Sequence, residues 1–258
     1  MSHKLVHYSV ADGIAEIMLD RPPVNALSLS LIDALLAALQ AAKDDAAVRA
    51  VIIGSAHKVF CAGLDLDIVR GKPAIEIKGF LERLYFALND VQYRMGKATI
   101  AAIDGAARAG GMTIAISCDM IIAGDASTFG YPEIDVGLIP ALHFVHLPRL
   151  VGKHQAFGPL FLGEPFDAAT AFRMGLLSEV VTKGTALDRA REVARTLAAK
   201  SPIVMKIGRD AFMRAVDADY RRAIENAAES FALVATTEDC QEGLNAFVEK
   251  RTPNYRGR

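Results

Sequence analysis

Residues 60–66 read Phe60-Cys61-Ala62-Gly63-Leu64-Asp65-Leu66 and follow an apolar, β-branched run at 48–53 that is typical of a buried strand. Small residues at Ala62 and Gly63 allow another backbone or a ligand to approach closely. We expect a helix to begin near Leu64, with its free N–H groups pointing into the space above the turn. Because a helix N-terminus attracts anions, this turn is a candidate site for a negatively charged oxygen.

A second turn of the same kind follows the apolar run at 98–103 and reads Gly105-Ala106-Ala107-Arg108-Ala109-Gly110-Gly111-Met112-Thr113. Two such turns side by side can aim two N–H donors at one oxygen, which is an oxyanion hole. Glycine and alanine are also common at such turns for packing alone. The second turn lacks the Gly-Lys-Ser/Thr of a phosphate-binding loop and the GxGxxG dinucleotide fingerprint, and the chain has no GxSxG nucleophile elbow.

The loop at 131–140 carries a carboxylate among apolar residues and prolines, and reads Tyr131-Pro132-Glu133-Ile134-Asp135-Val136-Gly137-Leu138-Ile139-Pro140. A carboxylate in a desolvated pocket has a raised pKa and can move protons near neutral pH. The competing interpretation of Glu133 is a surface glutamate on a turn.

The rest of the chain predicts strands and helices first and a helical tail last. Apolar runs at 5–8 and 14–19 flank Asp12-Gly13, a favoured hairpin turn. The remaining expected elements are a helix capped by Ser28 or Ser30 and running to about Lys43, a core helix at 114–122, and tail helices at 186–200, 203–215, 217–235 and 237–250. We divide the chain into an α/β core, 1–195, and a helical region, 196–258, which we expect to pack against a neighbouring subunit.

Composition narrows the class of protein. The chain has 258 residues, 52% of them hydrophobic, and 29 Lys and Arg against 30 Asp and Glu, so the basic surface of a nucleic-acid-binding protein is not expected. No apolar run approaches the ~20 residues of a membrane span. Cys61, Cys118 and Cys240 lie far apart, which argues for free thiols and against a metal site. We expect a cytoplasmic protein.

Together these segments resemble the crotonase superfamily, the enoyl-CoA hydratase/isomerase family. The resemblance covers nearly the whole chain, from Arg21-Pro22-Pro23-Val24-Asn25-Ala26-Leu27 to the stretch at 242–251. It implies an α/β fold, a spiral of ββα units with a C-terminal helical trimerisation region, in which trimers often pair into hexamers. It also implies an acyl-CoA thioester substrate and no separate cofactor, because coenzyme A is part of the substrate.

The resemblance assigns roles to individual residues. The N–H groups of Leu64 and Gly110 would form the oxyanion hole, and Glu133 would be a catalytic carboxylate. The CoA-binding candidates are Ala26, Ala62, Asp65 and, from the C-terminal segment of a neighbouring subunit, Phe247 and Lys250.

The chain departs from the family pattern at Thr113, because hydratases of the family carry a second catalytic glutamate there. Hydration needs a base for water and a proton for C2, and a threonine is a poor base. Moving a double bond needs one group that takes a proton from C2 and returns it at C4. We therefore favour an enoyl-CoA isomerase with Glu133 as the proton shuttle. The alternatives are an enoyl-CoA hydratase with water held near Thr113, and an inactive homologue that binds acyl-CoA.

Two further departures concern the substrate pocket. The bulky Leu142, Phe144 and Val145 stand where many hydratases are glycine-rich. Beside them, His143 and His146 are candidates for substrate contact. The competing interpretation is that they are capping or surface histidines. Arg108 can contact a CoA phosphate or a polar acyl group, or face solvent.

Overall fold

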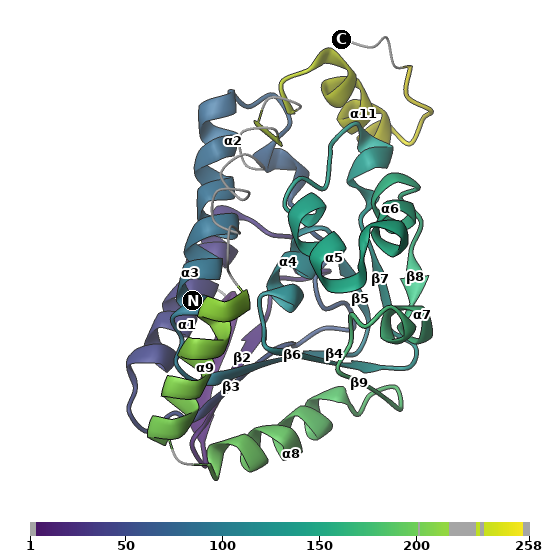
Figure 1. Cartoon of the computed structure of the whole chain (residues 1–258). Coiled ribbons are helices and arrows are strands. Elements are labelled where there is room, and N and C mark those ends of the chain that lie inside the picture. The colour runs from purple at the N-terminus through teal and green to yellow at the C-terminus, as the bar shows by residue number, and fades with distance from the viewer. Residues whose placement is uncertain (1–3, 201, 217–230, 233–234, 255–258) are drawn as a thin grey trace.

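The computed structural model describes residues 4–200, 202–216, 231–232 and 235–254. A six-stranded sheet in the order β1-β2-β3-β4-β6-β9 runs through the molecule (Figure 1). β1 pairs antiparallel with β2, and the remaining neighbours in this sheet pair in parallel. Its strands are β1 (Val6–Ala11), β2 (Ile14–Leu19), β3 (Ala50–Ser55), β4 (Ala98–Ile103), β6 (Met120–Gly124) and β9 (Glu179–Val181).

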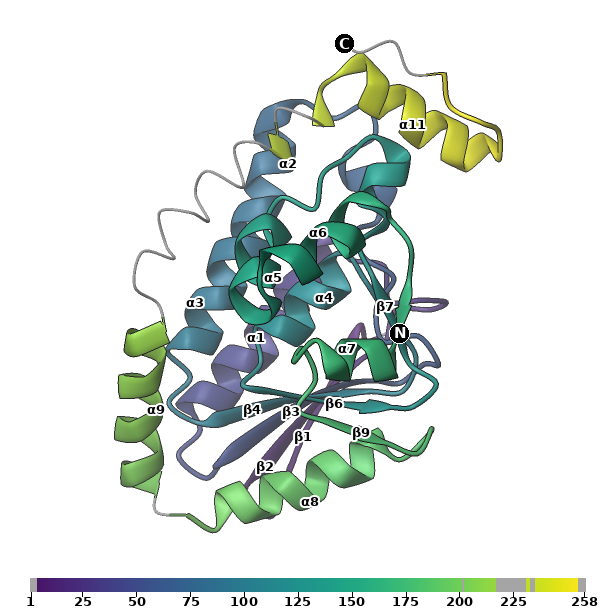
Figure 2. The same cartoon turned by 45° about the vertical axis from the view of Figure 1, so that its right-hand side comes forward.

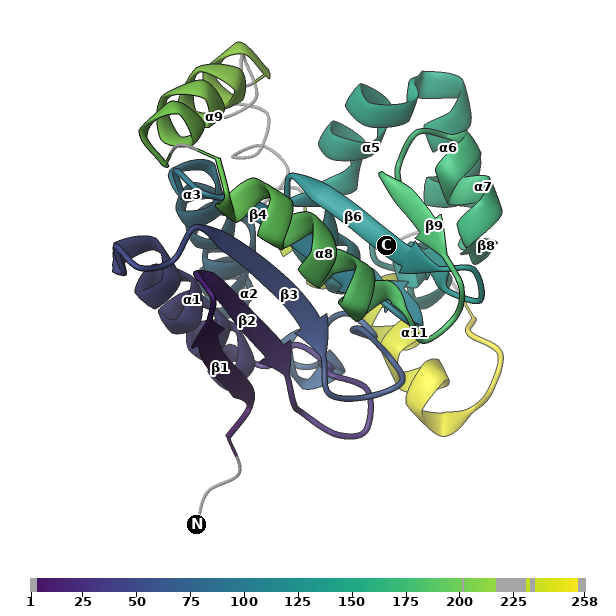
Figure 3. The same ribbon diagram turned by 90° about the horizontal axis from the view of Figure 1, so that it is seen from below.

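The central strands β3 and β4 are buried on both faces, to which their consecutive side chains point alternately. On β3, Val51 and Ile53 point to one face of the sheet and belong to the large core. Ala50 and Ile52 point to the other face and belong to a second, smaller core. The second core is closed by α8 (Ala186–Ala198), which lies across the opposite face (Figures 2 and 3).

The predicted N-terminal elements are confirmed. β1 and β2 form the hairpin, and both turn residues, Asp12 and Gly13, have positive φ, of 51° and 75°. The Ser28 side chain caps the first helix by accepting the N–H of Leu31. The helices before α8 are α1 (Leu29–Asp44), α2 (Ala74–Leu81), the π-helical η2 (Glu82–Ala87), α3 (Leu88–Tyr93), α4 (Gly110–Ile116), α5 (His143–Val151), α6 (Lys153–Phe161) and α7 (Ala168–Arg173).

The predicted core helix at 114–122 is wrong in its second half. α4 ends at Ile116, and the chain turns at 117–119 into strand β6. The Asp119 N–H donates to the Thr99 carbonyl, and Ile121 and Ile122 pair with β4. An apolar run alone does not distinguish a buried helix from a central parallel strand.

The helix expected near Leu64 is also wrong. Asp65 caps only a three-residue 3-10 helix, η1 (Leu66–Ile68), and the next α-helix, α2, begins at Ala74. The Leu64 N–H therefore belongs to an extended turn and not to a helix N-terminus.

The C-terminal part contains α9 (Pro202–Val216) and α11 (Glu238–Glu249), in agreement with two predicted helices. The predicted helix at 217–235 lies almost wholly outside the described residues. The predicted boundary between core and helical region, after residue 195, lies inside α8, which packs on the sheet. Helix α11 packs on the loop that carries Glu133. The cysteines are free and buried, and no helix among the described residues is long and apolar enough to span a membrane.

Candidate active site

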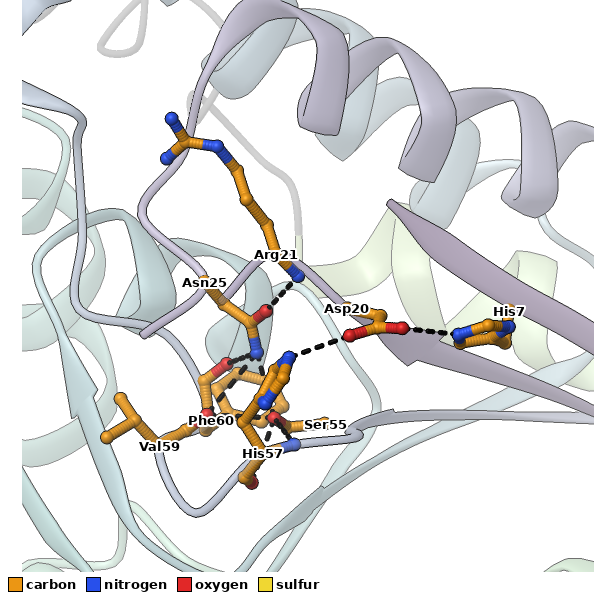
Figure 4. A network of polar contacts seen from close by, with 8 residues as sticks. All are labelled: His7, Asp20, Arg21, Asn25, Ser55, His57, Val59 and Phe60. Atoms are coloured by element: carbon orange, nitrogen blue, oxygen red, sulfur yellow. Dashed lines mark hydrogen bonds and ion pairs between the residues drawn. The ribbon is translucent and has the colours of Figure 1, made fainter. Parts of the chain in front are cut away.

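Asn25 anchors the first turn to the rest of the fold. Its Oδ1 accepts the Arg21 N–H at 2.7 Å, and its Nδ2 donates to Ser55 Oγ at 2.8 Å and to the Phe60 carbonyl at 3.0 Å (Figure 4). The left-handed backbone of Asn25, with φ of 52°, turns the side chain towards these partners. The end of β3 and the start of the turn are thereby fixed to the 21–27 loop.

The first turn lies directly against the second, as the sequence predicted. Cys61 forms a parallel bridge with Ala107 of β5 (Ala106–Arg108). Gly63 has φ of 99°, and a Cβ added to it would lie 2.7 Å from the Ala109 Cβ. Only glycine allows this approach, which brings Leu64 beside the start of α4.

The backbone of Leu64 and Gly110 offers two N–H donors at this junction. Leu27 donates to the Gly63 carbonyl at 2.7 Å and accepts from the Asp65 N–H at 3.0 Å, so the bridge turns the Leu64 N–H away from Leu27. Gly110 is the first residue of α4, where a helix has no internal acceptor for the N–H. In the described part of the chain, neither N–H meets an acceptor. Both remain available for a ligand oxygen.

Ala109, directly before Gly110, has a strained backbone, with φ of 48° and ψ of −116°. Such a conformation costs a non-glycine residue on the order of 1–3 kcal/mol and needs support from its surroundings. The Ala109 N–H donates to the Gly130 carbonyl at 3.1 Å, at the end of β7 (Thr128–Gly130). β5, β7 and β8 (Phe166–Asp167) form a small second sheet that carries this support.

Glu133 lies in the 3-10 helix η3 (Pro132–Val136) and is only 7% exposed, so the interpretation as a surface glutamate is wrong. Burial raises the pKa of its carboxyl group from 4.5 to about 8. Its Oε2 has no hydrogen-bond partner among the described residues. The Leu138 N–H donates to the Glu133 carbonyl at 2.9 Å and closes the loop. A buried carboxyl group with this pKa can take up and return a proton near neutrality.

Two tyrosines beside Glu133 were not predicted from the sequence. Burial and the neighbouring Glu133 carboxylate raise the pKa of both Tyr131 and Tyr85, so both phenols stay protonated. The Tyr131 hydroxyl is buried without a partner among the described residues. Tyr85 lies in η2, and π-helical turns are frequent at functional sites. For Tyr131, the only sequence signal of a place in the site is its position directly before Pro132-Glu133. For Tyr85 the sequence holds no such signal.

Thr113 and His143, both predicted to contact water or substrate, lie together. Thr113 Oγ1 of α4 is 3.2 Å from His143 Nε2 at the start of α5. His143 is 2% exposed and His146 is also buried, so the interpretation as surface histidines is wrong. Burial lowers the pKa of His143 to about 3 and that of His146 well below its usual value. Both imidazoles are therefore neutral.

Arg108 is half-buried and is hydrogen-bonded within the fold. Its guanidinium donates to the Thr128 carbonyl at 2.6 Å and to Thr128 Oγ1 at 2.8 Å. Burial lowers its pKa. The side chain ties β5 to β7 and so braces the two segments that lead to Gly110 and Glu133.

Three of the CoA-binding candidates are adjacent in the structure. Ala62 donates its N–H to the Val24 carbonyl at 3.0 Å. Arg21 donates to the Ala26 carbonyl at 2.7 Å and to Asp65 Oδ2 at 2.6 Å. Asp65 Oδ1 accepts the Asp67 N–H, so its carboxylate orders the turn locally.

The other two CoA-binding candidates lie apart from these. Phe247 on α11 is 62% exposed, and Lys250 ends this helix with φ of 55°. No hydrogen bond or ion pair between described residues joins either of them to Ala26, Ala62 or Asp65. No cluster of metal-ligating side chains occurs among the described residues.

Comparisons with known proteins identify the family of this chain. The enoyl-CoA hydratase/isomerase family model matches residues 9–258. A probable mitochondrial enoyl-CoA hydratase 2 of Arabidopsis thaliana is 34% identical over 98% of this chain and 85% of its own length. A crotonyl-CoA hydratase of Syntrophomonas wolfei is 32% identical over 99% of both chains. The crystal structure of an enoyl-CoA hydratase/isomerase from Xanthobacter autotrophicus Py2 superimposes with a TM-score of 0.87, at 29% identity over 97% of this chain and 98% of that one.

The fold, with its two facing turns, is that of the crotonase superfamily. Within that class, the chain belongs to the enoyl-CoA hydratase/isomerase family.

Proposed function

We propose that this protein is an enoyl-CoA isomerase that moves a double bond within an acyl-CoA thioester, with Glu133 as the single proton shuttle. Two observations together support this most: the buried Glu133 Oε2 has no hydrogen-bond partner among the described residues, and position 113 is a threonine and not a second glutamate. The Thr113 hydroxyl lies against a neutral imidazole and offers no second base.

The proposed reaction uses the site as follows. The thioester oxygen of a 3-enoyl-CoA accepts the N–H groups of Leu64 and Gly110. The Glu133 carboxylate removes one proton from C2, and the electron pair spreads over a dienolate held by these N–H groups. The resulting carboxylic acid returns the proton at C4, and the C3–C4 double bond becomes a C2–C3 double bond. No atom is gained or lost.

The pKa of Glu133 suits both halves of this cycle. A base whose pKa lies near the working pH can take a proton and give it back with similar ease. The protonated phenols of Tyr131 and Tyr85 beside it add no competing negative charge. One carboxyl group therefore suffices.

The second candidate function is hydration of a 2-enoyl-CoA, which the names of the relatives favour. The Arabidopsis protein is called a probable enoyl-CoA hydratase, and the Syntrophomonas protein a crotonyl-CoA hydratase. In this chain Glu133 would have to activate the water and also deliver the proton to C2, with the water held beside Thr113.

A homo-oligomer, a trimer or a dimer of trimers, is part of the proposal. Large apolar side chains of the C-terminal helices are exposed in the single chain, among them Ile207 and Phe212 on α9 and Phe247 on α11. A neighbouring subunit would cover such side chains and could bring Phe247 and Lys250 to the nucleotide. We propose the cytoplasm as the compartment, although some relatives are named as mitochondrial.

The test is to incubate the purified protein separately with 3-enoyl-CoA and 2-enoyl-CoA substrates. Product mass and the ultraviolet absorbance of the conjugated thioester are followed together. Conjugation of the 3-enoyl substrate without change in mass supports the isomerase. Gain of one water by the 2-enoyl substrate, without isomerisation, favours the hydratase instead. Binding without turnover of either would indicate an inactive acyl-CoA-binding protein.

A further inference from the structure

The peptide unit between Ala109 and Gly110 is held at its carbonyl end. Its N–H, at Gly110, meets no acceptor among the described residues and can donate to a ligand oxygen. Its carbonyl, at Ala109, accepts the N–H groups of Met112 at 2.9 Å and Thr113 at 3.2 Å, and it lies 3.2 Å from His143 Nε2. The third contact comes from α5, which is remote in sequence.

The direction of the His143 contact follows from its partners. A carbonyl oxygen can only accept, so Nε2 must carry the hydrogen in order to bond to Ala109. Thr113 Oγ1 lies at the same distance from this nitrogen and can share the hydrogen. Nδ1 is then the unprotonated nitrogen, and it is buried without a partner among the described residues. The ring is fixed against Tyr131, with centroids 4.5 Å apart.

We propose that His143 is a positioning residue of the oxyanion hole, which acts by donating Nε2–H to the carbonyl of the peptide whose N–H, at Gly110, binds the thioester oxygen. This proposal rests on the proposed function only in that the site binds an acyl-CoA thioester. It holds for an isomerase and for a hydratase alike.

Two physical effects make the contact useful. The first is orientation, because Ala109 has a strained positive φ, and rotation of this peptide would relieve the strain and turn the N–H away. A donor fixed on the carbonyl opposes that rotation. The second is polarisation, because a peptide that accepts a hydrogen bond at its oxygen becomes a better donor at its nitrogen.

The neutrality of the imidazole fits this role. Burial keeps the His143 pKa at about 3, so the ring does not gain a proton in the working pH range. The contribution of His143 is therefore a fixed hydrogen bond and not proton transfer.

The test compares His143→Phe, which keeps a ring but has no donor, with His143→Gln, whose amide can again donate to the Ala109 carbonyl. His143→Asn, with a shorter amide, replaces the phenylalanine variant if that one does not fold. His154→Phe is the control, because it makes the same change at an exposed histidine of the neighbouring helix α6. Circular dichroism verifies the fold of each variant.

The primary readout is the infrared carbonyl stretch of a non-reacting acyl-CoA labelled with ¹³C at the thioester carbon. Binding to the wild type and to His154→Phe should lower this frequency. In His143→Phe or His143→Asn we expect about half of that shift, and in His143→Gln most of it. We also expect kcat for the preferred substrate to fall about 10- to 100-fold in His143→Phe, less than the full loss of an oxyanion donor, while KM changes less than about threefold.

An unchanged carbonyl shift in a folded, ligand-binding variant that lacks the donor would overturn the role of His143 and leave the proposed function standing. If binding to the wild type does not shift the carbonyl frequency at all, the site has no working oxyanion hole, and the proposed function is wrong as well. If His143→Gln loses as much of the carbonyl shift as His143→Phe, the effect comes from packing and not from the hydrogen bond, which would also overturn the proposal.

Discussion

Asp20 and Glu133 are both buried carboxylates, but their surroundings differ. Asp20 bonds through its two oxygens to two imidazoles, His7 at 2.5 Å and His57 at 2.7 Å, next to the hydrogen-bonded side chain of Asn25 (Figure 4). Glu133 keeps one oxygen without a partner among the described residues and has its pKa raised to about 8.

This difference indicates a structural role for Asp20 and a chemical role for Glu133. A buried polar group that is matched by partners stabilises the fold, whereas one that is left unmatched lowers stability and is retained where it reacts or binds. We therefore expect changes near Asn25 to act on stability, and changes at Glu133 to act on turnover. The following predictions test that division, from the largest expected effect to the smallest.

Glu133→Gln removes the proton shuttle and preserves the shape of the side chain. We expect kcat to fall about 10³-fold, within the range for loss of a general acid–base group, with no loss of thermal stability. Steady-state kinetics and a melting curve measure both quantities. Glu164→Gln, at an exposed glutamate, is the control and should leave both unchanged. A near-normal kcat in Glu133→Gln would contradict the mechanism in which Glu133 is the single proton shuttle.

Asn25→Ala removes the hydrogen bonds to Arg21, Ser55 and Phe60. We expect the free energy of unfolding to fall by about 3 kcal/mol, since buried partners are left unsatisfied. Thermal denaturation should show a melting temperature lower by about 10 °C. Asn25→Asp should not rescue it, because the Phe60 carbonyl needs a donor. If Asn25→Ala lowers kcat strongly but leaves the melting temperature unchanged, the division between the two regions is incorrect.

The pH dependence of stability should also distinguish the Glu133 region. The folded pKa of about 8 lies above the value of 4.5 in the unfolded chain, so between these pH values the folded state holds a proton that the unfolded state has released. The wild type therefore loses stability relative to Glu133→Gln as pH rises from 4.5 to 8, and the difference is constant above pH 8. Melting temperatures of both proteins at pH 5 and pH 9 measure this. An equal difference at the two pH values would contradict the raised pKa.

Lys97→Met should have the smallest effect. The Lys97 ammonium group donates to the carbonyls of Ala42, Lys43 and Asp45 at the end of α1. We expect a loss of about 1 kcal/mol in the free energy of unfolding, because the carbonyls can bond to water instead, and no change in kcat. A fall in kcat would show that this end of the molecule is coupled to the active site.

The sequence predicted the parts of this site that have a local signature. The small residues around Gly63 and Gly110 marked two close turns, and the prolines around Glu133 marked its loop. Contacts between distant segments were not predictable in this way. The imidazole of His143 reaches Ala109 only because α5 folds back over α4, and Tyr85 lies beside Glu133 only because a π-helical turn places it there.

The fold shows the same limit at two elements. The hairpin and the Ser28 cap depend on neighbouring residues and were predicted correctly. The run at 114–122 was misassigned because whether it forms a helix or a strand is decided by pairing with β4, which is a long-range interaction.

The central claim, that Glu133 alone carries the proton, is tested most directly with a 3-enoyl-CoA deuterated at C2. A single turnover in ordinary water is stopped, and the product is analysed by mass spectrometry and NMR. A lone buried shuttle predicts that a fraction of product molecules carries the deuterium at C4. Isomerised product with no deuterium at C4 would contradict the account, because the proton removed from C2 and the proton added at C4 would then come from different sources.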